Sequence, residues 1–316
     1  MYSLNDYGWM FADEERRRCF LQSMAREVNK DSVVLDLGSG PGLLALHALS
    51  LGARKVFAVD NNPLVKLLYR LAPEEIASGR LHVIHGDSRQ TQFPELADVV
   101  LADIRGPTSL VNGTLDIVRD ALIRLARPGA KVIPFRDRIY LAPVTEEKTH
   151  AELDRFWRNI PIAWDLQPLF ELERGQMRRT RGKNSRLLAP EKQWATIHWT
   201  DSDPIQNVDI ISFRVEQEGR FDGILQWFDL DFADDLSLSN SPNCDDRVYG
   251  RMCFMLSEPV SVVVDDVINV VFRVYPTRCG EHWVWSGSIE RDGKCRARFS
   301  ENSLKTAQLA AQLVGN

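Results

Sequence analysis

The sequence predicts an α/β domain with a parallel sheet, followed by a domain of antiparallel strands. Up to about residue 142, short apolar runs alternate with helical segments, which is typical of a parallel sheet with helical crossovers. From Trp194 onward the pattern changes to short strand-like runs, and turn pairs such as Asp222-Gly223 and Asp292-Gly293 separate several of them. This spacing of strands and turns is typical of an antiparallel sandwich or barrel.

Three regions are therefore expected along the 316 residues. They are an N-terminal helical cap over 1–30, a Rossmann-like α/β domain over 31–143 and an antiparallel β-barrel domain over 144–316. In the first domain the predicted strands are 33–37, 55–60, 81–85, 97–102, 131–134 and 137–142. A helix is expected over about 115–126, since Arg127-Pro128-Gly129 would end it.

In the second domain the predicted strands are 195–199, 208–215, 223–231, 251–256, 261–264, 269–275, 282–290 and 294–299. Residues 146–160 are expected to be helical, and a short closing helix is expected over 303–314. Arginines are frequent over 174–186, and we interpret this run as a surface loop, because segments rich in charge are usually solvated. It lacks the interleaved aromatic residues that are typical of a nucleic-acid site.

Composition and charge indicate a soluble globular protein. Apolar residues make up 44% and charged residues 26%, and the net charge is −5, so no general attraction to nucleic acid or to an anionic membrane is expected. No apolar run has the length of a signal peptide or a membrane span. The five cysteines are scattered without C-x-x-C spacing, which favours a reducing, cytoplasmic location and no metal site.

The most informative motif is the glycine-rich turn Gly38-Ser39-Gly40-Pro41-Gly42, which follows the apolar run 33–37. A second predicted strand, 55–60, ends in Asp60. Asp36 and the three glycines give the pattern D-x-G-x-G-x-G, which differs from the G-x-G-x-x-G of dinucleotide sites and is the form expected for S-adenosylmethionine (SAM).

This interpretation assigns roles to individual residues. Gly38, Gly40 and Gly42 are expected to shape the cofactor loop, because glycine lets the backbone approach a ligand. Asp36 is expected to orient that loop or the methionyl amine, and Asp60 to bind the ribose. Asp87, with Ser88 beside it, follows the third predicted strand and is expected near the adenine amino group.

Several segments resemble the protein arginine N-methyltransferases, a family with a class I methyltransferase domain and a β-barrel. The matching segments are Met10–Arg16 preceded by Tyr7, then Gly52–Val56, Ile133–Leu141 and Gly223–Phe232. The resemblance implies that the N-terminal helix covers SAM and that Arg16 holds the methionyl carboxylate. It also implies an arm, at about 150–190, through which the family forms homodimers. Candidate arm residues are Phe156, Trp157, Trp164, Leu166, Leu169 and Phe170.

The acceptor site departs from the family pattern. Two family glutamates grip the substrate guanidinium; Asp103 matches the first and the neutral Asn112 the second, and these are the candidate catalytic residues. Arg105 adds a positive charge to the same loop. The family's T-H-W segment falls near Arg247-Val248-Tyr249, so its histidine has no equivalent.

Three interpretations of the acceptor site stay open. In the first, arginine is the substrate and further acids come from Asp6, Glu14 or Asp245-Asp246. In the second, another amine or hydroxyl, of a small molecule or peptide, is methylated, and Arg105 recognises an anionic group on that substrate. In the third, the chain binds SAM without catalysis. The candidate substrate contacts are Tyr7, Arg105, Asp245 and Asp246.

Overall fold

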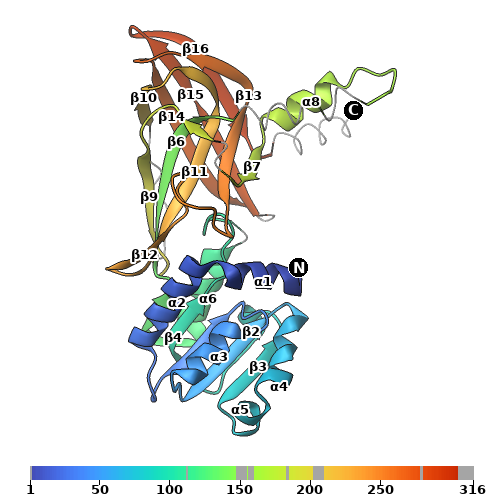
Figure 1. Cartoon of the computed structure of the whole chain (residues 1–316), viewed down its shortest axis with the longest axis vertical. Coiled ribbons are helices and arrows are strands. Elements are labelled where there is room, and N and C mark those ends of the chain that lie inside the picture. Colours follow the sequence, from blue (N-terminus) through green and yellow to red (C-terminus); the bar gives the residue numbers. More distant parts are fainter. Residues whose placement is uncertain are drawn as a thin grey trace. The chain divides into compact units, whose positions relative to one another are not determined.

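The computed structural model describes residues 2–111, 113–146, 155, 160–182, 185–201, 210–277 and 280–304. The chain divides into two compact units (Figure 1). Unit 1 comprises Met1–Asp137 together with two later segments, Ile197–Pro204 and Asp229–Ser239. Unit 2 comprises Arg138–Thr196, Ile205–Phe228 and Asn240–Asn316. Within the ranges described, no helix has both the length and the apolar character needed to cross a membrane.

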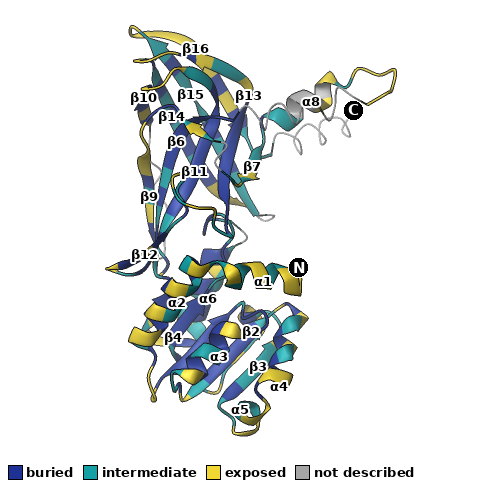
Figure 2. Cartoon of the chain, in the orientation of Figure 1, coloured by how far each residue is buried: buried dark blue, intermediate teal, exposed yellow. Residues whose placement is uncertain are grey.

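Unit 1 contains a parallel sheet of five strands in the order β3-β2-β1-β4-β5. The strands are β1 Val33–Leu37, β2 Lys55–Asp60, β3 Leu81–His85, β4 Ala97–Ala102 and β5 Ala126–Ile133. All residues of β1 are buried, as is usual for a strand covered on both faces. The neighbouring strand β2 is buried along most of its length as well (Figure 2). Leu37 pairs with Val59 on one side and Ala102 on the other, so β1, β2 and β4 end at one edge. Strand order changes direction between β1 and β4, where such sheets bind ligands.

The helices of unit 1 connect and cover these strands. They are α1 Leu4–Ala12, α2 Glu14–Glu27, α3 Leu43–Ser50, η1 Pro63–Leu67, α4 Leu68–Leu71, α5 Pro73–Ala77, η2 Ser88–Gln90 and α6 Thr114–Arg124. A capping box between Ser3 and Asp6 starts α1, and the Asp13 side chain caps α2. α2 buries Cys19, Phe20 and Met24 on one face.

A late segment of the chain packs against α2 within unit 1. It contains the end of β11, Gly219–Ala233, and the short strand β12, Leu236–Ser239. The Phe20 and Phe232 rings meet edge to face with centroids 4.8 Å apart, and Ser23 Oγ donates to Phe232 O at 3.0 Å. The helix predicted to cover the cofactor is therefore held by residues more than 200 positions away in sequence.

The other described strands form two antiparallel sheets. A sheet of seven strands has the order β7-β13-β11-β6-β8, with β12 on β11 and β9 on β6, and a second has the order β10-β14-β15-β16. The strands are β6 Arg136–Thr145, β7 Met177–Thr180, β8 Arg186–Leu187, β9 Lys192–His198, β10 Ile211–Arg214, β11 Gly219–Ala233, β13 Arg251–Val262, β14 Val267–Thr277, β15 Gly280–Arg291 and β16 Lys294–Asn302. Phe254 contacts Phe272, Trp283 and Trp285 in an aromatic core. The predicted α/β and antiparallel classes are confirmed.

Two predictions in the second half differ from the structure. The predicted strands 251–256 and 261–264 form one continuous strand, β13. The pairing register with β11 shifts between Phe221 and Gly223, and the extra residues of β13 at this irregularity include Pro259. The arginine-rich run 174–186 is not a loop throughout, because it contains β7 and the first residue of β8. Met252 of β13 pairs with Arg179 of β7, so this basic segment is part of a sheet.

Some predictions fall on residues outside the described ranges. They concern most of the helix expected over 146–160, including Phe156 and Trp157, and most of the closing helix expected over 303–314. Asn112 is also outside these ranges. Part of the expected arm is described as the helix α8, Gln167–Arg174, which projects from the sheets (Figure 1).

Candidate functional site

The glycine-rich loop lies directly after β1 at the carboxyl edge of the parallel sheet. Gly40 has φ of +55°, and a Cβ there would lie 2.7 Å from Tyr7 Cζ. Gly38 has φ of +68°, and its Cβ would collide with Ile104 Cγ2. Both positions need glycine, because Tyr7 of α1 packs on Gly40 and Ile104 of the loop between β4 and α6 packs on Gly38.

Asp36 holds the glycine loop from within β1. Its Oδ2 accepts from Ser39 Oγ at 2.7 Å and from Ala45 N at 3.0 Å, so one carboxylate ties the strand to the loop and to α3. Burial raises the pKa of Asp36 to about 7, and the negative charges of Asp60 and Asp103 add to this shift. This geometry agrees with a loop-orienting role for Asp36.

Asp60 holds the same loop from the end of β2. Its Oδ2 accepts from Gly40 N at 2.6 Å, and its Oδ1 accepts from Asn62 N at 2.6 Å. Burial and the negative charge of Asp60 raise the pKa of Tyr7 to about 12. Asp60 and the Tyr7 ring therefore both approach the loop residue Gly40, and the predicted ribose contact of Asp60 stays a prediction.

Asp87 and Ser88 lie after β3, beyond Asp60 along the same sheet edge. Asp87 pairs with Arg89, with Nη2 and Oδ2 2.6 Å apart, and this guanidinium holds the pKa of Asp87 below its usual range. Ser88 is buried, and its carbonyl oxygen accepts from Arg124 Nη2 at 2.9 Å. The Asp87 carboxylate is therefore already paired with a partly exposed arginine. Its contact with adenine stays a prediction.

Arg16 and Asp103 form an ion pair inside unit 1. Arg16 comes from the first turn of α2, and Asp103 follows the last residue of β4. The side chains are only 4% and 9% exposed, and Arg16 Nη1 also donates to Met10 O at 2.7 Å. The sequence predicted both residues, one for the cofactor carboxylate and one for the acceptor, but carried no sign that they meet.

Arg105 forms a second ion pair, which sequence reasoning missed. Its Nη1 lies 2.6 Å from Oδ1 of Asp137 at the start of β6, and both side chains are completely buried. The predicted contact of Arg105 with an anionic substrate group is left without support, because Asp137 and protein atoms surround the guanidinium. No local pattern in the sequence marks Asp137 as the partner of Arg105, because the two residues are 32 positions apart.

The other acids weighed for the acceptor site have local structural roles or lie elsewhere. Asp6 accepts from Ser3 N and Ser3 Oγ, each at 2.7 Å, in the α1 capping box, and Glu14 is exposed at the start of α2. Asp246 lies in unit 2, where it accepts from Gly182 N at 2.6 Å and from Arg251 Nη1 at 3.3 Å. Asp245 is exposed in the same loop of unit 2.

An apolar hollow of about 510 Å³ lies on unit 1 between α1, the start of α3 and the η1–α4 segment. Its lining is apolar apart from the tip of Tyr7 and Arg70: Leu4, Tyr7, Gly8, Phe11, Pro41, Leu43, Leu67, Arg70 and Leu71. It adjoins the glycine loop through Pro41 and Tyr7. Such a surface suits a protein segment better than a charged ligand.

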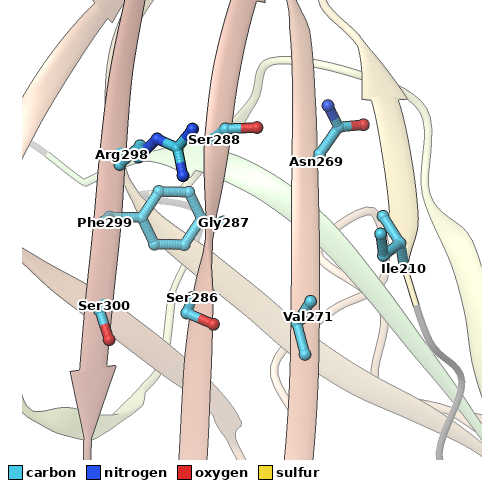
Figure 3. Close-up of a pocket in the computed structure, with 9 residues that line it drawn as sticks. All are labelled: Ile210, Asn269, Val271, Ser286, Gly287, Ser288, Arg298, Phe299 and Ser300. Atoms are coloured by element: carbon cyan, nitrogen blue, oxygen red, sulfur yellow. The ribbon is translucent and has the colours of Figure 1, made fainter. Parts of the chain in front are cut away.

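A second hollow of about 510 Å³ lies on the four-stranded sheet of unit 2 (Figure 3). Ser288 and Arg298 lie beside each other on the paired strands β15 and β16, and Ser286 and Ser300 pair two residues farther along. None of the predicted site residues lines this hollow, so the candidate site is the sheet edge in unit 1.

Comparisons with known proteins agree with this geometry. The family model of ribosomal protein L11 methyltransferase (PrmA) matches residues 17–129. Protein arginine N-methyltransferase 2 of Dictyostelium discoideum is 25% identical over 237 residues, covering 71% of this chain and 46% of that protein. The probable histone-arginine methyltransferase CARM1 of Oryza sativa subsp. indica is 29% identical over 255 residues, covering 75% and 48%. The chain thus spans about half the length of the curated relatives it matches.

Two solved structures share the fold. The Trypanosoma brucei PRMT1 enzyme-prozyme heterotetrameric complex with AdoHcy has a TM-score of 0.82 at 18% identity, covering 94% of this chain and 96% of that one. Arabidopsis thaliana protein arginine methyltransferase 10 has a TM-score of 0.78 at 18% identity, covering 95% and 98%. The chain is therefore similar in sequence, and alike in fold, to the class I protein arginine N-methyltransferases, and the resemblance predicted from the N-terminal segment and from residues 223–232 is confirmed.

Proposed function

We propose that the chain binds SAM at the carboxyl edge of the unit 1 sheet and transfers its methyl group to a nitrogen acceptor, as arginine N-methyltransferases do. The observation that carries this proposal is the convergence of two carboxylates on the glycine loop. Asp60 binds Gly40 N at 2.6 Å and Asp36 binds Ser39 Oγ at 2.7 Å, from adjacent parallel strands. The T. brucei complex, which shares the fold, is a complex with AdoHcy, the demethylated form of this cofactor.

The charges at this edge fit the cofactor. Asp36, Asp60 and Asp103 are close enough for the last two to raise the pKa of the first. A cluster of three acids favours a bound cation, and SAM carries a sulfonium and an ammonium. Arg16, the guanidinium beside Asp103, suits the one anionic group of SAM, its carboxylate.

The cofactor supplies an activated methyl group whose departure leaves a neutral thioether, so the protein contributes mainly orientation and exclusion of water. In this proposal Gly38 and Gly40 let the backbone approach the ligand, and Asp60 holds the ribose side. Asp103, at the end of β4, orients the acceptor nitrogen and accepts hydrogen bonds from it.

One observation favours a guanidinium as the acceptor. Arg105 adds a positive charge to the acceptor loop, and an uncompensated charge there would repel a substrate guanidinium. Arg105 is paired with Asp137 and completely buried, so its charge is compensated by a carboxylate of its own. The positive charge of Arg105 is therefore no obstacle to a cationic acceptor, and Asp103 itself contacts the guanidinium of Arg16.

A second candidate function is that of a SAM-binding subunit without catalysis. Asp103 is engaged by Arg16, and the position of the second family glutamate holds the neutral Asn112. The similar T. brucei complex is described as an assembly of enzyme and prozyme. In that case this chain would hold the cofactor and activate a catalytic partner.

Two measurements on the purified protein separate these candidates. Calorimetric titration with AdoHcy tests cofactor binding, and incubation with tritiated-methyl SAM and an arginine-rich peptide tests transfer. We expect binding and labelling, and no labelling with Asp103→Ala or with a lysine version of the peptide. Binding without labelling of any peptide or cell extract favours the non-catalytic subunit, and absence of binding by the folded protein contradicts both.

We also propose that the chain forms a homodimer in which the arm of one protomer covers the apolar hollow of the other. Near α8, Trp164 is 80% exposed and Leu169 is 45% exposed. On unit 1, Leu4 and Leu71 line the hollow and are both more than half exposed. Exposed apolar surfaces of this kind mark protein interfaces, and Asp165 beside Trp164 offers a carboxylate for Arg70.

Light scattering at micromolar concentration tests the homodimer. We expect a dimer for the wild type and a monomer for Trp164→Glu and for Leu71→Glu. Ile123→Glu is the matched control, because Ile123 is 81% exposed on α6 and lies outside both surfaces. A wild-type monomer, or three variants that behave alike, contradicts the proposed interface.

A cytoplasmic location is proposed as well. Among the described residues, Cys244, Cys253 and Cys295 are free thiols, which suit a reducing compartment. Fractionation of cells that produce the chain, with antibody detection, would test this location.

A further inference from the structure

We propose that Arg105 and Asp137 are a positioning pair that fixes the loop carrying Asp103, and this proposal rests on the role of Asp103 in the proposed function. Three consecutive residues of that loop are held by three different elements. Asp103 pairs with Arg16 of α2, and the Ile104 side chain packs over Gly38 of the cofactor loop. Arg105 pairs with Asp137 of β6.

The pair is better suited to fixing geometry than to adding stability. Both side chains are 0% exposed, so each charge has lost its hydration. Because that desolvation is expensive, buried ion pairs are often no more stabilising than apolar residues of similar size. A guanidinium, however, is a planar donor that binds a carboxylate only in certain directions, whereas an apolar side chain can shift or rotate.

Asp137 is a firm anchor for this contact, because the residues before it are held by both late segments of unit 1. Phe135 N donates to Asp231 O at 3.0 Å, and Phe135 O accepts from Trp199 N at 2.9 Å. Arg136 Nε lies 2.6 Å from Asp231 Oδ2. The backbone that presents Asp137 is therefore tied down on two sides, and Arg105 transmits that fixed position to Asp103 two residues away.

The experiment compares Arg105→Met/Asp137→Leu with the wild type and with Glu95→Gln, which removes an exposed ion-pair partner on the same unit. The readouts are the urea midpoint, the calorimetric Kd for AdoHcy, hydrogen exchange of the amides of 103–111, and kcat and KM. We expect a urea midpoint near that of the wild type, a Kd changed by less than about 3-fold and loop exchange at least ~10-fold faster. We also expect kcat to fall at least ~30-fold while KM changes less, because a small displacement of a catalytic group is costly.

Arg105→Lys is the conservative variant, since it keeps the charge but loses the planar fork. We expect an exchange rate and a kcat between those of the wild type and the double variant. If the double variant does not fold, Arg105→Lys provides the test. The proposal is then overturned if the amides of 103–111 in Arg105→Lys exchange at the wild-type rate. Wild-type exchange and kcat in a folded double variant also overturn it. If the wild type transfers no methyl group, the proposed function fails, while loop exchange still shows whether the pair positions the loop.

Discussion

Arg16 and Asp103 join the helix α2 to the end of β4 through an ion pair whose side chains are nearly buried. Arg16 also lies over the Phe11 and Phe20 rings, with its guanidinium carbon 5.4 and 5.3 Å from their centroids. The pair thus connects the residue proposed for the cofactor carboxylate with the residue proposed for the acceptor. Removing one partner is therefore expected to leave the other as an unpaired buried charge and to change its position.

A double-mutant cycle tests this coupling. Arg16→Met or Asp103→Leu alone leaves a buried charge without its partner, so each is expected to lower the free energy of unfolding by about 3–5 kcal/mol. The double variant is expected to lose clearly less than the sum of the two. Urea unfolding without cofactor measures all four proteins, and additive losses would show that the two charges do not interact in solution.

Asp60→Ala is expected to weaken SAM binding by a factor of about 10 or more. The lost interactions are charge-assisted hydrogen bonds, worth roughly 1.5–3 kcal/mol, and the substitution also removes the acceptor of Gly40 N. Calorimetric titration measures the affinity. Glu95→Gln is the control, since Glu95 pairs with Arg54 and Lys55 on an exposed part of the same unit. Equal affinities of the two variants for SAM would show that Asp60 does not contact the cofactor.

The fold was largely predictable where the sequence carries local signals. β1 to β4 have the predicted bounds, because each is a short apolar run that ends at an acid, a glycine or a loop. β5 begins at Ala126 instead of 131, because Ala126 pairs with Ala97 across an irregularity that no local pattern announces. β7 was missed because its arginines look like a solvated loop, whereas its backbone pairs with β13.

The site was predictable only in part, for the same reason. The glycine loop and Asp36 lie within ten residues of each other, so their spacing showed how they would meet. Arg16 and Asp103 are 87 residues apart and Arg105 and Asp137 are 32 apart. Charged pairs at such separations leave no periodic pattern, so Arg105 looked like a substrate contact until its partner was seen.

Asp36 is expected to make stability depend on pH. The folded protein raises its pKa to about 7 from 3.8, so between these values the folded state keeps a proton that the unfolded chain releases. The free energy of unfolding contributed by this group therefore falls as pH rises through that range and stays low above it. Asp36→Asn should remove this slope and raise the free energy of unfolding by about 1–3 kcal/mol at about pH 8, because no buried negative charge remains at this position. The amide oxygen of the new side chain can still accept from Ser39 and Ala45.

Urea unfolding at several pH values measures this effect. Asp116→Asn is the control, since Asp116 is an exposed carboxylate on α6. We expect the control to keep the wild-type slope. An Asp36→Asn protein with that same slope would mean that Asp36 ionises normally in the folded state.

The packing of Tyr7 on Gly40 gives a steric prediction. Gly40→Ala carries the strain of a positive φ, about 1–2 kcal/mol, and its Cβ would lie 2.7 Å from Tyr7 Cζ, so the ring must move. Gly52→Ala is the matched control, because Gly52 has φ of +91° and nothing lies within 4 Å of the added Cβ. Gly40→Ala is therefore expected to lower the free energy of unfolding by at least ~1 kcal/mol more than Gly52→Ala.

Tyr7→Ala separates the two contributions. In its background the clash at residue 40 is gone, so Gly40→Ala should cost about as much as the backbone strain alone, while the cost of Gly52→Ala should be unchanged. Urea unfolding of the six proteins gives both comparisons. If Tyr7→Ala lowers the cost of Gly40→Ala no more than that of Gly52→Ala, the α1 helix does not rest on the glycine loop in solution.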